Sequence, residues 1–116
     1  MIRKFFLNVS HKEQKRRFLE RLDNPDKNWK FSISDASERE HWDEYMIAYD
    51  EMIRYTATPN APWFVVPADK KWFTRIVVAA AVVDAMQDLD LHHPEVGKEK
   101  RKELITARHQ LLREKR

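Results

Sequence analysis

The sequence predicts a mostly helical α/β fold, and three observations lead to this prediction. Residues 3–9 and 63–66 are short apolar segments with the composition of strands, and four segments with helical periodicity separate and follow them. Two strands this far apart cannot satisfy their own edges, so the order β-α-α-β-α-α resembles the end of a parallel α/β sheet. The only glycine is Gly97, where average usage in 116 residues would give about eight.

The first strand and helix are expected within residues 3–22. Residues 3–9 (RKFFLNV) are aromatic and aliphatic and lead to Ser10. Ser10 and Glu13 have the spacing of a capping box, in which Glu13 reaches back to the N–H of the cap residue. A helix over residues 11–22 is therefore predicted, and residues 23–25 (DNP) are expected to end it.

The longest helix is expected over residues 36–56, after a second capping-box spacing at Asp35 and Glu38. One apolar stripe, expected to pack in the core, runs along it: Trp42, Tyr45, Met46, Tyr49, Met52 and Ile53.

A buried strand over residues 63–66 and two further helices complete the prediction. The helix over residues 70–87 is apolar all round between residues 76 and 83, which favours packing on several sides. The last helix, over residues 98–114, is expected to turn five residues inward: Leu104, Ile105, Ala107, Leu111 and Leu112.

Composition excludes several classes of site. Without cysteine the chain has no disulfide, zinc–thiolate site or cysteine nucleophile. A phosphate-binding P-loop needs G-x-x-x-x-G-K-[ST], and Gly97-Lys98 is the only pair that could end one. The motif is absent, because His92 stands where the first glycine is needed and Glu99 where Ser or Thr is needed. The longest apolar run is too short to span a bilayer, so a cytoplasmic protein without membrane association is expected.

The net charge of +3 conceals strong patches. Residues 1–30 carry nine Lys or Arg against four Asp or Glu, a balance of +5, and residues 31–60 carry two against seven, a balance of −5. The helix over residues 11–22 contains five cations: Lys12, Lys15, Arg16, Arg17 and Arg21. Such a helix could grip a polyanion through arginine's planar fork, or it could be a solvated surface helix.

Several motifs together resemble the C-terminal part of family-2 polyphosphate kinases. They are Val9-Ser10 with Glu13-Gln14 and Arg16-Arg17-Phe18; Asn28-Trp29-Lys30-Phe31; Trp42-Asp43-Glu44-Tyr45; and Ala61-Pro62-Trp63 leading to Val66-Pro67-Ala68-Asp69. The resemblance implies a P-loop kinase-like three-layer α/β/α fold. It also implies phosphoryl transfer between inorganic polyphosphate and nucleoside mono- or diphosphates (ADP/ATP, GDP/GTP or AMP), with Mg²⁺.

The resemblance also assigns roles. Residues 10–34 correspond to the lid that closes over the phosphates, and residues 35–116 to helices and the last strand of the core. Arg17 and Arg21 would be catalytic, and Lys12, Lys15, Arg16, Arg17 and Arg21 would bind polyphosphate. The family's phosphate-binding loop and metal-binding aspartates lie upstream of these motifs, so we expect a fragment that is inactive alone, and whether it is an enzyme is left open.

Other candidates carry less support. Asp69, Lys71 and Arg75 follow the second strand, where ligands gather in open α/β sheets, and are candidates for the nucleotide side. Asp88, Asp90, His92 and His93 match no ligand spacing, so no metal site is predicted. A small nucleic-acid-binding or interaction module is the alternative function, although the acidic middle of the chain argues against nucleic acid. An uncovered sheet edge favours a homo-oligomer.

Overall fold

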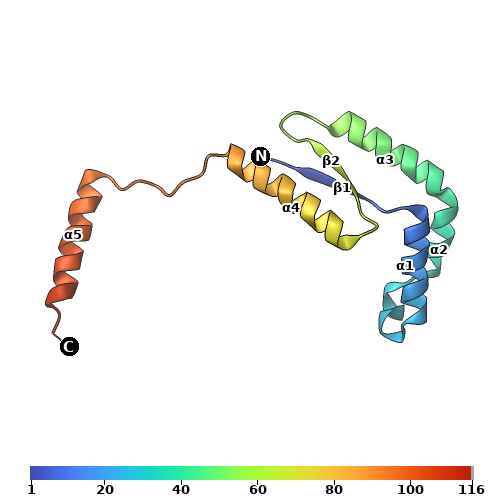
Figure 1. The fold of residues 1–116 in the computed structure, drawn as a ribbon, viewed down its shortest axis with the longest axis horizontal. Coiled ribbons are helices and arrows are strands. Elements are labelled where there is room, and N and C mark those ends of the chain that lie inside the picture. Colours follow the sequence, from blue (N-terminus) through green and yellow to red (C-terminus); the bar gives the residue numbers. More distant parts are fainter. Residues whose placement is uncertain (116) are drawn as a thin grey trace. The chain divides into compact units, whose positions relative to one another are not determined.

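The computed structural model describes residues 1–115 and confirms the predicted fold class, a mostly helical α/β arrangement with two strands (Figure 1). The elements follow one another as β1 (Lys4–Asn8), α1 (His11–Asp23), the 3₁₀ helix η1 (Pro25–Lys30), α2 (Ile33–Glu38), the 3₁₀ helix η2 (Arg39–His41), α3 (Trp42–Thr56), β2 (Trp63–Pro67), α4 (Lys71–Asp88) and α5 (Lys98–Arg113). The chain divides into two compact units, Met1–Ala85 and Met86–Arg116.

The two strands form a parallel two-stranded sheet in which Lys4 lies opposite Trp63 and Asn8 opposite Pro67. Helix α3 covers one face of this sheet and the first part of α4 lies on the other (Figure 1). On the α3 face the ring of Phe6 packs against Tyr49, with 4.9 Å between centroids. On the α4 face the rings of Phe5 and Phe64 stack at 5.3 Å. The alternation of side chains along each strand accounts for this division between the faces.

Helix α1 ends in a cap that the sequence did not indicate. The C-cap is Asn24, and Asn28 in η1 turns its side-chain amide back to the carbonyls of Arg21, Leu22 and Asn24 at 2.8–3.1 Å. The carbonyls of Arg21 and Leu22 lie in the last turn of α1 and need donors from outside the helix, which Asn28 supplies. The T-shaped contact between Phe18 and Phe31 fixes η1 and the following chain against the same helix.

The single helix predicted over residues 36–56 is wrong, because the chain forms two helices there. The capping box is made by Ser32 and Asp35, three residues before the predicted one, and it starts α2. The 3₁₀ turn η2 separates α2 from α3, and Arg39 within it donates to the carbonyl of His11 and the side chain of Gln14 on α1. These contacts with α1 interrupt a segment whose helical periodicity alone favours one continuous helix. Residues 1–115 therefore contain five α-helices instead of the four predicted.

Burial is much lower than the apolar composition suggests. Among residues 1–115 the buried apolar side chains are Val66, Ala68 and Ala85. Tyr45 and Met52, both expected in the core, are 42% and 37% exposed. The segment predicted to pack on several sides is open as well, with Ile76 60% and Val83 53% exposed.

Helix α5 belongs to the second unit and does not bury the residues expected to point inward. Leu104, Ile105, Ala107, Leu111 and Leu112 are all exposed. No helix in residues 1–115 has both the length and the apolar composition needed to cross a membrane.

Thr74 closes the turn between β2 and α4, and its substitution tests how much this junction contributes to stability. The buried hydroxyl donates to the carbonyls of Pro67 and Lys70, at 2.8 and 3.2 Å. Thr74→Val leaves the carbonyl of Pro67 without this donor and should lower the free energy of unfolding by about 1 kcal/mol in urea titrations. Thr74→Ser keeps the hydroxyl and serves as the control. Equal losses for both variants would show that the hydroxyl contributes nothing.

Candidate functional site

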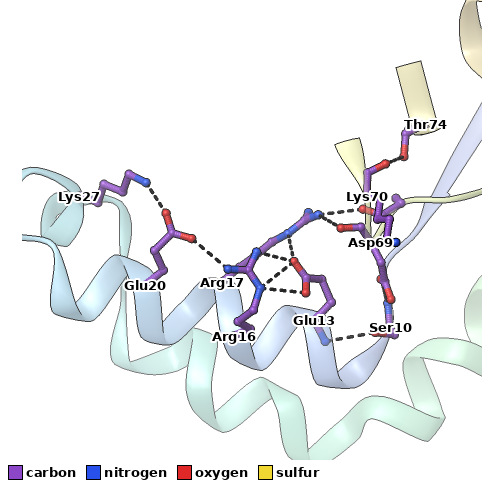
Figure 2. Close-up of polar contacts among 10 residues, drawn as sticks. Ser10, Glu13, Arg16, Arg17, Glu20, Lys27, Asp69, Lys70 and Thr74 are labelled. Carbon is purple, nitrogen blue, oxygen red and sulfur yellow. Dashed lines mark hydrogen bonds and ion pairs between the residues drawn. The ribbon is translucent and has the colours of Figure 1, made fainter. Parts of the chain in front are cut away.

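The candidate site is the basic helix α1, which is fastened to the chain that follows β2 (Figure 2). Asp69 accepts a hydrogen bond from the backbone N–H of Ser10 at 2.7 Å, while the Ser10 hydroxyl accepts from the N–H of Glu13 at 3.1 Å. Arg17 donates from Nη2 to the carbonyls of Ala68 at 2.8 Å and Asp69 at 3.1 Å. The first two turns of α1 are thereby held at the carboxyl end of the strand.

Glu13 has a different role from the one its spacing predicted. The predicted bond back to Ser10 is absent because Asp69 takes that N–H. The Glu13 carboxylate instead accepts two hydrogen bonds from Arg16 Nε, at 2.9 and 3.1 Å, one from Arg16 Nη2 at 2.7 Å and one from Arg17 Nε at 3.1 Å. The hydrogen bonds from Arg16, and less strongly the one from Arg17, lower the pKa of Glu13 from 4.5 to about 2 against an opposing effect of burial.

The spacing of Glu13 from its two arginines predicts ion pairs on a helix, whereas the capping-box pattern predicts a bond to Ser10. Glu13, Arg16 and Arg17 stand three and four positions apart, so they share one side of a helix and can pair. Both arginines donate to the same carboxylate, and they differ in how exposed their side chains are. The side chain of Arg17 is 24% exposed and that of Arg16 62% exposed.

A second group of ion pairs continues along the exposed side of α1. Arg16 Nη1 lies 3.5 Å from Glu20, and Lys27 of η1 lies 2.6 Å from the same carboxylate (Figure 2). The hydrogen bond and charge of Lys27 lower the pKa of Glu20. Pairs this exposed contribute little to stability, and they leave their cations accessible to an incoming anion.

The remaining cations of the helix are less engaged. Lys12 and Lys15 are exposed, and neither forms an ion pair within the described part of the chain. Arg21 is half-buried and lies over the ring of Phe18, 5.8 Å from its centroid. The structure therefore places all five predicted cations on one helix but divides them: Arg17 is bound to backbone carbonyls, Arg16 is paired yet exposed, and Lys12, Lys15 and Arg21 have no carboxylate partner among residues 1–115.

The three candidates after β2 are not brought into one cluster. Asp69 is occupied by Ser10, whereas Lys71 and Arg75 are exposed at the start of α4 without an ion pair in residues 1–115. Asp69 thus positions α1. Lys71 also lies close enough for its charge to help lower the pKa of Glu20, so one cation of the α4 start faces the same region as α1.

Residues 1–115 do not supply a Mg²⁺ site. Among residues 1–115 there is no group of three or more His, Asp or Glu side chains that could hold a metal ion. Hard divalent cations need several oxygen ligands converging on one point, and here the carboxylates of Glu13, Glu20 and Asp69 are each taken by protein donors. What this helix offers chemically is positive charge and N–H donors.

The lowered pKa of Glu13 predicts how acid affects the folded chain. The folded-state pKa of about 2 lies below the ordinary 4.5, so the ionised carboxylate contributes stability that is complete above about pH 4.5 and is lost progressively as the pH falls toward 2. Glu13→Gln should lower stability at pH 7 and flatten the pH dependence between 4.5 and 2 in thermal unfolding curves. Glu51→Gln, which changes an exposed residue on α3, is the control. An unchanged acid profile for Glu13→Gln would contradict this assignment.

The chain is similar to proteins of one known family. The model of the family Polyphosphate kinase 2 (PPK2) matches residues 1–94. An uncharacterized protein from the chlN 3′ region of Leptolyngbya boryana is 50% identical over 108 residues, covering 93% of this chain and 79% of that protein. The ADP-polyphosphate phosphotransferase of Rhodopseudomonas palustris is 46% identical over 110 residues, covering 95% of this chain and 38% of the relative.

A solved structure agrees with the sequence relatives. The crystal structure of polyphosphate kinase 2 from Arthrobacter aurescens TC1 superposes with a TM-score of 0.79 at 44% sequence identity, covering 91% of this chain and 39% of that one. The chain therefore spans well under half the length of the phosphotransferases that it matches. On the family match and these similarities, the chain belongs to the polyphosphate kinase 2 family.

Proposed function

We propose that this chain supplies the phosphate contacts of a lid, residues 10–34, in phosphoryl transfer between inorganic polyphosphate and a nucleoside mono- or diphosphate. Family membership supports the reaction class, since relatives are named as ADP-, AMP/ADP- and GDP-polyphosphate phosphotransferases. The observation that carries the proposal for these residues is the anchoring of a helix with five cations at the carboxyl end of β2. Ligands of open α/β sheets bind beside that end of the strands.

The chemistry required of such a helix is electrostatic. Phosphoryl transfer depends on positioning and on neutralising charge that spreads over the phosphoryl oxygens in the transition state, with little covalent help from the protein. Exposed Lys12, Lys15 and Arg16 can meet successive phosphates of a chain, and Arg21 can donate two parallel hydrogen bonds to one phosphate. A linear polyanion suits cations spread along a helix.

The five cations would have different roles, some positioning the helix and others binding phosphate. Arg17 acts as a positioning residue in the geometry described, because its guanidinium already has three protein acceptors. A direct contact between Arg17 and a phosphate requires that it leave the carbonyls of Ala68 and Asp69. Arg16 has no backbone acceptor in residues 1–115 and is 62% exposed, so a phosphate can reach it by displacing only its carboxylate partners, Glu13 and Glu20.

The proposal assigns binding to this chain and not a complete reaction. Its sequence has no P-loop, and residues 1–115 offer no metal-binding group. We therefore expect this polypeptide to bind polyphosphate without transferring phosphate by itself. Turnover by the purified chain would contradict this part of the proposal.

Polyphosphate binding can be tested with two triple variants that remove the same charge. Replacing Lys12, Lys15 and Arg21 by Ala should weaken binding of long-chain polyphosphate at least about tenfold in isothermal titration and should reduce the salt dependence of the affinity, because fewer counterions are released. Replacing Lys98, Lys102 and Arg108 of α5 by Ala is the matched control and should have a much smaller effect. Losses of equal size would indicate general attraction to a basic protein.

A competition experiment addresses the alternative of nucleic-acid binding. Polyphosphate should displace any bound single-stranded oligonucleotide, and the affinity for the oligonucleotide should not depend on its bases, because the exposed cations of α1 would contact only its phosphates. Base-dependent affinity that resists displacement by polyphosphate would favour the nucleic-acid module instead.

A further inference from the structure

Helix α5 has an apolar side that nothing in its own unit covers. The second unit, as described over residues 86–115, holds only the end of α4 besides this helix. Residues at three- and four-residue steps share one side of a helix, and the side concerned here, called the α5 face, consists of Arg101, Leu104, Ile105, Arg108, Leu111 and Leu112. Its four apolar side chains are 50–66% exposed. Exposed apolar side chains gathered on one face mark an interaction surface.

Helix α3 has a face with the same spacing and the opposite charge. Met46 and Tyr49 are half-buried, and the ring of Tyr49 packs on Phe6 of the sheet, so the opposite side of the helix is turned to solvent. This outer face of α3 consists of exposed residues: Glu44, Ile47, Ala48, Glu51 and Tyr55. Ile47 and Tyr55 are 61% and 87% exposed, so they are available to a partner.

The order of charged and apolar residues is the same on the two faces. On α5, Arg101 is followed by apolar residues three and four positions later and by Arg108 seven positions later. On α3, Glu44 is followed in the same way by two apolar residues and then by Glu51. Helices whose side chains repeat every seven residues pair along one seam, and here the two seams carry opposite charges.

The charged residues of the two faces are open to new partners. In residues 86–115 the only ion pair of α5 joins Lys100 and Glu103, at 3.5 Å. In residues 1–115 Glu51 forms no ion pair, and Glu44 has only a 3.5 Å contact with His41 in which both side chains are exposed. Exposed pairs of this kind contribute little, so a guanidinium can approach either carboxylate.

The shape and the wider charge of the two regions agree with such a pairing. A depression of about 430 Å³ lies at the start of α3 beside Ala48, and Glu38 and Glu44 border it. The small side chain of Ala48 leaves room there for a longer side chain of another helix. Residues 98–116 carry eight Lys or Arg against three Asp or Glu, a balance of +5, whereas the balance of residues 31–60 is −5. Complementary charge steers two surfaces together and selects the partner.

A second copy of the chain can supply the partner helix more readily than the chain's own α5. The connection between α4 and α5, residues 89–97, spans at most about 30 Å when fully extended. Helix α4 lies on the opposite face of the sheet from α3 (Figure 1). The outer face of α3 lies beyond both the sheet and α3 itself, each about 10 Å thick, so the connection would have to be fully stretched around the sheet. The α5 of another copy has no such restriction.

We propose that α5 of each copy docks on the outer face of α3 of a second copy, which gives a two-fold symmetric dimer with two equal contacts. In each contact the two arginines of the α5 face meet the two glutamates of α3, and its leucines cover Ile47 and Tyr55. The dimer is independent of the proposed function, because the cations of α1 take no part in it.

Two charge-reversal variants test the dimer. Variant A carries Glu44→Arg and Glu51→Arg, and variant B carries Arg101→Glu and Arg108→Glu. Like charges then meet in a homodimer of either variant, so sedimentation equilibrium should show self-association at least about tenfold weaker than that of the wild type. In a mixture, both contacts of an A–B dimer again join Arg with Glu, and association should return to about the wild-type affinity.

Two pairs of alanine substitutions test the apolar part of the contact. Leu104→Ala with Leu111→Ala should weaken the dimer at least about tenfold. Glu103→Ala with Gln110→Ala, on the opposite side of α5, is the matched control and should leave the affinity unchanged. Alanine favours the helix at all four positions, so a loss of affinity is not a loss of α5 itself.

Four results would overturn the proposal: a wild-type chain that stays monomeric, a dimer that variants A and B form as strongly as the wild type, variants that keep their helix content by circular dichroism but do not associate on mixing, or protection of α5 by α3 that does not depend on concentration. The triple variant of α1 should dimerise like the wild type. Because Glu51→Gln and the triple variant of α5 alter this interface, the unfolding and polyphosphate titrations in which they are controls are made at concentrations where the chain is monomeric.

Discussion

The contact on which the site depends is the one between Arg17 and the chain that leaves β2. Its guanidinium bonds to the carbonyls of Ala68 and Asp69 and to the carboxylate of Glu13, and it therefore links the helix to the sheet. Charged donors on backbone carbonyls are stronger than neutral hydrogen bonds, and partial burial protects them from screening. Every other cation of α1 takes its position from this attachment, because a helix fixed at its first two turns has a defined direction. Asp69 strengthens the attachment by accepting the N–H of Ser10.

Glu13 affects how α1 can bind an anion. One carboxylate shared by two arginines lowers the local positive charge and orders both side chains before a ligand arrives. In the function proposed here, the exposed partner, Arg16, would exchange Glu13 for a phosphate, whereas the enclosed partner, Arg17, would stay attached to the backbone carbonyls. Such a division between a holding arginine and a binding arginine follows from their difference in exposure, 24% against 62%. The lid proposed for residues 10–34 would need both properties, a fixed attachment and side chains that change partners.

The sequence predicted the strands and most helices because their signals are local. The run of apolar residues around Phe5 and Phe64, the Ser10 cap and the apolar length of α4 each act within a few residues. The break at Arg39 could not be predicted, since it arises from contacts with His11 and Gln14 more than twenty positions earlier. The same reason explains the site. Five cations on one helix were visible in the sequence, but the partition among them depends on Ala68 and Asp69, which are distant in the chain. Burial was overestimated because an apolar stripe such as that of α3 shows which side is suited to packing and does not show whether anything packs there.

The central claim, that the accessible cations of α1 bind a chain of phosphates while Arg17 keeps the helix in place, can be tested directly by nuclear magnetic resonance on the labelled chain. Titration with long-chain polyphosphate should shift the backbone amides and the Lys and Arg side-chain signals of residues 10–30, including Lys12 and Lys15, and salt should reverse the shifts. The Nε–H signal of Arg17 should stay in place. Shifts of equal size along α5, or a displaced Arg17 signal with Lys12 and Lys15 unchanged, would contradict the account.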